Sequence, residues 1–177
     1  MNNKNDIDSS DNVGKNISAL WMGDFSTLIE DAIDLSKQAQ INGVDLTVKE
    51  IFAISGEGVI DFDNSKRVIP DHKPLDLTED NYWKLQPGSY IVRYNEIVKV
   101  PLNALGILLP RSSLLRMGAT IVGAWWDSGY QGRGQGLLII GHPIKIYQNA
   151  RIAQIVFLRS KPVKKGYSGQ YQLEDTQ

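Results

Sequence analysis

A hydroxyl-rich segment that follows an arginine suits the binding of a phosphate group. It reads Pro110-Arg-Ser-Ser-Leu-Leu-Arg116. The guanidinium of Arg111 offers a planar fork of donors that matches phosphate oxygens, and the hydroxyls of Ser112 and Ser113 can donate further hydrogen bonds. The same pattern also fits the start of an ordinary helix preceded by a solvated arginine. The segment is therefore a candidate phosphate-binding element, with that alternative left open.

A glycine-rich run places an acid and an aromatic ring around one tight turn. Residues 123–136 contain five glycines, which indicates backbone geometry that side chains would forbid or a ligand lying against the main chain. Asp127 and Tyr130 straddle a Ser-Gly turn, so both side chains can project from one hairpin tip. Gln135, near the end of the run, is a further candidate for ligand contact. The alternative is a glycine-rich hairpin without a ligand.

Two more segments carry polar groups in unusual places. Asp45 interrupts an otherwise apolar strand, where it is either functional or a cap of the strand end. Near the C-terminus, Lys165, Tyr167 and Gln170 lie among glycines. This composition suits an arm that folds over a nucleotide, with a cation on phosphate and a ring on the base, although a solvated tail is also compatible with it.

The bulk composition excludes several classes of protein. The chain of 177 residues has a net charge of −1, which attracts neither nucleic acid nor a membrane surface. It has no cysteine, so disulfides and thiolate zinc sites are excluded. Its apolar runs are too short to cross a bilayer, and the Asn- and Ser-rich start lacks the apolar core of a signal peptide. We expect a cytoplasmic protein.

The elements that position these segments are expected to be almost entirely β. Residues 1–16 lack apolar periodicity and are expected to be a disordered tail. A capping-box pattern and one apolar face predict a single helix over Ser26–Gln38. Short alternating strands then recur about every ten residues, which indicates a sandwich or barrel. We expect one β domain over residues 17–161 and a mobile C-terminal arm over residues 162–177.

Taken in order, the motifs resemble those of the dUTPase and dCTP deaminase superfamily, most of all the archaeal-type dUTPases. The signature is Arg111-Ser-Ser-Leu114, then Asp127-x-Gly-Tyr130-x-Gly132, then Arg151-Ile-Ala-Gln-Ile155. The resemblance covers the chain from about Gly43 to Gln172. It implies a distorted jelly-roll that forms a homotrimer, with active sites between subunits, and hydrolysis of dUTP to dUMP and pyrophosphate.

The resemblance also implies a role for each matching residue. Asp127 corresponds to the aspartate that activates the attacking water, and Tyr130 to the ring beneath the deoxyribose. Asp45 corresponds to the aspartate that orients the water shell of the cofactor, Mg²⁺. The remaining matching positions imply contacts to the nucleotide or its phosphates: Arg111, Ser112, Ser113, Arg116, Gln135, Gln154, Lys165, Tyr167 and Gln170.

Two other functions stay open. A dCTP deaminase, or an enzyme with both activities, is favoured by Arg116, which the deaminase branch shares. It is disfavoured by Leu137, since that position, counted from Asp127, holds the proton-shuttling glutamate in deaminases. A silent dUTP-binding regulator is disfavoured by the presence of both Asp127 and Tyr130.

Four aromatic residues lie in or near these motifs without a clear role. His72 and His142 match no motif, and we interpret both as surface or structural residues. Trp125 and Trp126 precede the candidate base. At least one of these two is expected in the core, because successive strand residues face opposite sides of a sheet.

Overall fold

The fold is almost entirely β in a computed structural model that describes residues 19–21 and 24–176. The expected disordered tail, residues 1–16, lies outside the described residues. The two helices in the described part are short, α1 (Leu35–Gln38) and α2 (Ser112–Arg116). The strands are β1 (Ile29–Glu30), β2 (Ala39–Gln40), β3 (Gly43–Ser55), β4 (Asp71–Pro74), β5 (Tyr82–Leu85), β6 (Gly88–Tyr94), β7 (Ile97–Lys99), β8 (Ala104–Pro110), β9 (Ala119–Val122), β10 (Gln131–Gly132), β11 (Gln135–Ile140), β12 (Ile144–Tyr147) and β13 (Arg151–Arg159).

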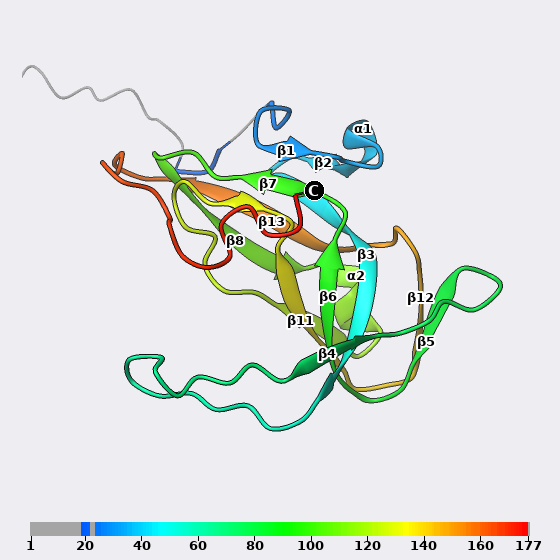
Figure 1. The fold of residues 1–177 in the computed structure, drawn as a ribbon. Coiled ribbons are helices and arrows are strands. Elements are labelled where there is room, and N and C mark those ends of the chain that lie inside the picture. The colour runs from blue at the N-terminus through cyan, green and yellow to red at the C-terminus, as the bar shows by residue number, and fades with distance from the viewer. Residues whose placement is uncertain (1–18, 22–23, 177) are drawn as a thin grey trace, which may run out of the picture.

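The main sheet curls into a nearly closed barrel (Figure 1). Its strand order is β8-β13-β3-β6-β11-β9, and β2 and β4 also pair with β3. A bridge between Gly106 and Trp126 joins β8 to the segment that follows β9, so the two ends of the sheet approach each other. Smaller sheets, β1-β7-β10 and β5-β12, complete the fold. The predicted all-β jelly-roll architecture is confirmed.

The long strand β3 organises the interior. Its first half pairs with β13 and its second half with β6. Val44, Leu46 and Val48 are fully buried, as is Phe157 of β13, whose ring lies 6.5 Å from that of Phe25. Burial of such apolar side chains is the main force that closes the barrel.

An irregularity in the β3–β13 pairing bears on the chemistry. The register shifts between Arg151 and Ala153, after which Gln154 lies opposite Asp45. A bulge of this kind re-aims the side chains on either side of it. It brings polar groups from two strands together in an otherwise apolar wall.

The predicted helix over Ser26–Gln38 is wrong for most of its length. Residues around Phe25 form a turn, the short strand β1 follows, and Asp31 adopts a φ of 55°. Only Leu35–Gln38 is helical, and its cap is Asp34, whose side chain accepts a hydrogen bond from the backbone N–H of Lys37. Of the apolar residues that suggested a helical face, Leu28 and Ile29 are buried, Ile29 through pairing of β1 with β7, whereas Ile33 is exposed, so tertiary pairing overrides the local pattern.

The segment between β3 and β4 is a long hairpin that projects from the body (Figure 1). It leads into strand β4, Asp71–Pro74, which pairs with the end of β3. Among the described residues, no helix has the length and apolarity needed to span a membrane.

Candidate active site

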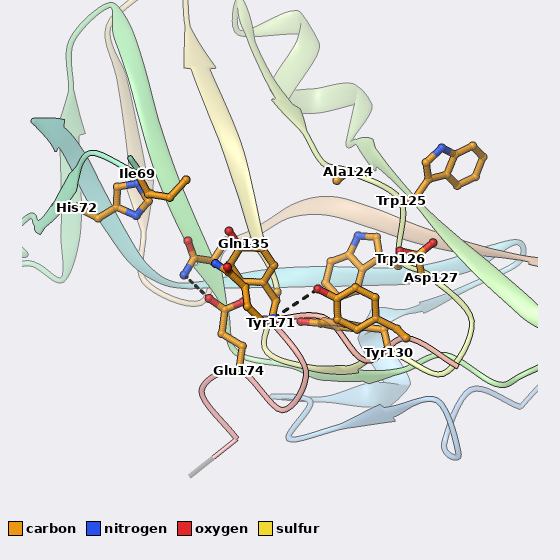
Figure 2. Close-up of a pocket in the computed structure, with 13 residues that line it drawn as sticks. Ile69, His72, Ala124, Trp125, Trp126, Asp127, Tyr130, Gln135, Tyr171 and Glu174 are labelled. Atoms are coloured by element: carbon orange, nitrogen blue, oxygen red, sulfur yellow. Dashed lines mark hydrogen bonds between the residues drawn. The ribbon is translucent and has the colours of Figure 1, made fainter. Parts of the chain in front are cut away.

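One candidate site is a pocket of about 550 Å³ around the glycine-rich hairpin. We call it the hairpin pocket (Figure 2). Five of the predicted site residues line it: Asp127, Tyr130, Gln135, Tyr167 and Gln170. The other lining residues are Ile69, His72, Ala124, Trp125, Trp126, Gly134, Tyr171 and Glu174. The hairpin and the C-terminal segment, far apart in sequence, therefore face one cavity.

The turn at the hairpin tip separates the acid from the ring. The N–H of Tyr130 donates to the carbonyl of Asp127 at 3.0 Å, and Gly129 adopts a φ of 83°, which favours glycine. Asp127 is left exposed, whereas Tyr130 is only 8% exposed. A carboxylate that reaches solvent beside a fixed ring can meet a ligand that rests on that ring.

Three aromatic rings fix the floor of the hairpin pocket. Tyr130 packs edge-on against Trp126 at 5.3 Å between ring centroids and against Tyr167 at 5.7 Å. A side chain at Gly134 would meet the indole of Trp126 at 2.2 Å, so the backbone must lie directly against that ring. Burial raises the pKa of the Tyr130 hydroxyl, and Glu174 raises it further, which keeps the ring neutral.

The structure shows which of the two adjacent tryptophans lies in the core. Trp126 is buried in the core, whereas Trp125 is 63% exposed, and both border the hairpin pocket. His72, interpreted from the sequence as a surface or structural residue, also lines this pocket. No local pattern predicts that contribution, because β4 brings His72 there only through its pairing with β3.

Glu174 is a site residue that the sequence did not predict. Its carboxylate accepts a hydrogen bond from the side-chain amide of Gln135 at 3.2 Å (Figure 2). Burial raises the pKa of Glu174 and the adjacent Asp175 raises it further, while Arg93 lowers it. Its presence depends on the path of the C-terminal segment, for which the sequence carries no signal.

A second pocket, of about 330 Å³, lies around the phosphate-binding motif. We call it the arginine pocket. It contains four of the predicted residues: Asp45, Arg111, Ser112 and Gln154. Gln40, Leu109 and Pro110 complete its wall.

Asp45 is the electrostatic centre of the arginine pocket. Its side chain is 1% exposed, and Oδ2 lies 3.0 Å from Nε of Arg111 and 3.4 Å from Nη1 of Arg151. Its Oδ1 accepts a hydrogen bond from the amide of Gln154 at 3.2 Å. Burial raises the pKa of Asp45, opposed first by Arg111, then by Gln154 and Arg151. Arg151 belongs to the third sequence motif, but no role was predicted for it from the sequence.

Three predicted residues line neither pocket. Ser113 and Arg116 lie on exposed positions of α2, where Nη1 of Arg116 reaches the carbonyl of Ser112 at 3.5 Å, and Lys165 is exposed. Within one chain, the candidate base and the candidate phosphate-binding groups thus line separate pockets. Among the described residues, no group of three or more His, Cys, Asp or Glu side chains could hold a metal ion by itself.

Comparison with known proteins assigns the chain to a family. Residues 22–160 match the sequence model described as "DCD: dCTP deaminase-like". The chain belongs to the dCTP deaminase-like family. Among its solved relatives by fold is the 2'-deoxycytidine 5'-triphosphate deaminase of Agrobacterium tumefaciens, with a TM-score of 0.56 and 18% identity. That match covers 76% of this chain but only 44% of the Agrobacterium chain, and it supports the fold alone.

Curated archaeal relatives are much more similar in sequence. A probable deoxyuridine 5'-triphosphate nucleotidohydrolase of Methanosarcina mazei is 48% identical over 84% of this chain and 89% of its own. The deoxyuridine 5'-triphosphate nucleotidohydrolase of Methanocaldococcus jannaschii is 49% identical over 76% of this chain and 87% of its own. The family resemblance predicted from the motifs is confirmed.

The surroundings of Leu137 bear on deaminase chemistry in this family. Leu137 lies in β11 opposite Ile91 of β6 and Val122 of β9. An apolar side chain between two apolar neighbours cannot donate or accept a proton. Besides Asp127, the lining of the hairpin pocket contains one further carboxyl group, that of Glu174.

Proposed function

We propose that this protein hydrolyses dUTP to dUMP and pyrophosphate in the cytoplasm. The observation that carries the proposal is the exposed carboxylate of Asp127 beside the buried ring of Tyr130 in the hairpin pocket. The names of the archaeal relatives supply the substrate class. A pocket walled by aromatic rings, with one free carboxylate, suits a nucleoside whose phosphates extend beyond the pocket.

Asp127 acts as the general base. It accepts a proton from a water molecule whose oxygen attacks the α-phosphorus. The new P–O bond forms as the bond from the α-phosphorus to the bridging oxygen breaks, and pyrophosphate leaves with that oxygen. An exposed aspartate suits this role because its carboxylate can reach a ligand-bound water.

The glycine-rich hairpin binds and recognises the nucleoside. Tyr130 lies beneath the deoxyribose, where its fixed position against Trp126 leaves little room for a 2′-hydroxyl. Main-chain groups of the glycine-rich run bind uracil, because Gly134 of that run lines the hairpin pocket and has no side chain to cover its backbone. Tyr167 and Gln170 cover the bound nucleotide from the C-terminal arm.

The arginine pocket supplies the phosphate-binding groups to a different copy of the chain. Arg111 and Ser112 face this pocket, with Gln154 beside them, while the base lies in the hairpin pocket. A homotrimer in which each hairpin pocket meets the arginine pocket of a neighbour completes three equal sites. Arg151 joins this set because it shares Asp45 with Arg111.

Magnesium fits this site as a metal held mainly by the triphosphate and by water. When bound, Mg²⁺ neutralises the charge of the phosphates. Oδ1 of Asp45 accepts a hydrogen bond from the amide of Gln154, and Oδ2 lies within ion-pair distance of two guanidinium groups without a hydrogen bond to either. Asp45 therefore suits a water-mediated contact to the ion and not a direct bond.

Mixing two inactive variants tests whether the site is shared between copies. Chains with Asp127→Asn lack the base, and chains with Arg111→Gln lack the phosphate fork. In randomly mixed trimers, one site in four combines the intact halves, so co-refolded variants should recover about a quarter of the activity of the unmodified protein. Activity no higher than the sum of the separate variants would contradict a shared site.

The proposed function is tested with dUTP and dCTP in separate incubations, each with Mg²⁺ or with a chelator. Pyrophosphate, ammonia and the product nucleotide are measured. We expect pyrophosphate and dUMP from dUTP, loss of turnover with the chelator, and no ammonia from dCTP. Ammonia from dCTP would show that another acid, such as Glu174, replaces the group missing at Leu137. Binding of dUTP without turnover would indicate a regulator.

A further inference from the structure

The last residues of the chain are tied to the hairpin that carries the candidate base. The side chain of Gln172 donates to the carbonyl of Gly129 at 3.0 Å and accepts from the N–H of Gln131 at 3.2 Å. The N–H of Leu173 donates to the carbonyl of Gln131 at 2.8 Å, and the N–H of Arg133 donates to the carbonyl of Glu174 at 2.9 Å. We call residues 172–175 the clasp.

The clasp ends in a partly buried ion pair with the main sheet. Oδ2 of Asp175 lies 2.9 Å from Nε of Arg93, whose side chain is 23% exposed. Arg93 is itself held by Glu50 at 2.7 Å and by the ring of Phe52, 4.9 Å from its guanidinium carbon. Nε of Arg133 donates to the backbone carbonyl of Asp175 at 2.9 Å. Arg93 is therefore a preformed anchor in β6 and not a loose surface cation.

The clasp turns the arm into a strap fixed at both ends. Before the clasp, the N–H of Tyr167 donates to the carbonyl of Ser128 at 2.8 Å. Between these two attachments lie Gln170 and Tyr171, which both line the hairpin pocket; Figure 2 shows Tyr171 there. A free tail samples many positions and loses conformational entropy when it orders around a ligand. A strap that is fixed at both ends has lost most of that entropy before the ligand binds.

We propose that the clasp makes the arm act in cis, so that each chain closes its own hairpin pocket, with Arg93 and Asp175 as positioning residues for the arm. The proposal rests on the proposed function, in which that pocket binds the nucleoside of dUTP. Under this arrangement the arginine pocket comes from a neighbouring copy, but the arm does not.

The test compares full-length Asp175→Asn with the unmodified protein. Loss of a partly exposed ion pair should raise the KM for dUTP about fivefold and leave kcat within about twofold. The melting temperature should not change, because the clasp covers the barrel without forming its core. Glu30→Gln is the matched control, since it removes an ion pair to Lys99 of comparable exposure that does not touch the arm. An unchanged KM in Asp175→Asn would overturn the proposal.

A readout that needs no turnover separates the clasp from the proposed function. Trypsin can cut after the exposed residues Lys164 and Lys165 in the arm. We expect faster cleavage there in Asp175→Asn, and equal rates in the control and the unmodified protein. Equal rates in all three would overturn the clasp. Faster cleavage without any dUTP hydrolysis in the unmodified protein would overturn the proposed function alone.

Mixed assemblies test the cis arrangement directly. Asp127→Asn chains with intact arms are co-refolded with Tyr167→Ala chains that keep the base. In cis, every site carries one of the two defects, and no activity is gained over the separate variants. In trans, some sites combine an intact base with an intact arm, and a gain in activity would overturn the proposal. The mixture of Asp127→Asn and Arg111→Gln chains is the control for exchange of chains between assemblies. If that mixture recovers no activity, the KM and trypsin results decide whether the proposal holds.

Discussion

Asp127→Asn is expected to bind dUTP normally and to turn it over about 10²- to 10⁴-fold more slowly. The asparagine keeps the shape of the side chain but cannot accept the proton of the attacking water. Because Asp127 is exposed at the hairpin tip, the substitution should leave the free energy of unfolding unchanged. Turnover is measured as pyrophosphate release, and affinity as binding of a non-hydrolysable dUTP analogue.

The control for this substitution is Asp63→Asn, an equally conservative change in the projecting hairpin between β3 and β4. It should match the unmodified protein in both assays. Near-normal turnover by Asp127→Asn would remove this residue from the mechanism. A loss of binding equal to the loss of turnover would instead make it a substrate-binding residue.

Arg111→Gln is expected to lower kcat/KM for dUTP by about 10²- to 10³-fold, the range seen when one donor to developing charge is removed. It should also destabilise the fold by about 1–3 kcal/mol, because Asp45 stays buried with only Arg151 as a cationic partner. Steady-state kinetics and thermal unfolding of the same preparations measure the two effects.

A lysine at this position separates the two roles of Arg111. Arg111→Lys restores a positive charge beside Asp45 and should recover most of the stability. It lacks the planar fork, so kcat/KM should remain at least about tenfold low. Full recovery of kcat/KM with lysine would mean that Arg111 only neutralises Asp45. Arg159→Gln is the control, since that guanidinium stacks on Trp21 and borders neither pocket.

Because the two pockets are separate, the contacts of Asp45 with Arg111 and Arg151 matter for the proposed site as well as for local stability. A buried carboxylate that holds two guanidinium groups sets their positions before any ligand arrives. Such preorganisation is useful where charge develops on phosphate oxygens, because the donors need not reorganise during the reaction. The same geometry supports the proposed water-mediated contact of Asp45 to Mg²⁺.

The sequence by itself determined the fold class, and most of the residues that it predicted for the site line one of two pockets. Apolar and polar residues alternate in the sequence of β3, which predicted a strand, and the all-β prediction was confirmed, although the first half of β3 is buried on both faces. The positions of Asp127 and Tyr130 around a Ser-Gly turn were also predictable, since a tight turn is a local structure. The motifs were sufficient to identify the family.

Only the tertiary structure decided which of these residues meet. Leu28 and Ile29 match a helical face equally well, but both are buried outside a helix, Leu28 in a turn and Ile29 in β1, which pairs with β7. Glu174 and His72 reach the hairpin pocket through the clasp and the β3–β4 pairing. These are contacts between segments distant in the chain, and their free energy depends on packing that no local pattern records.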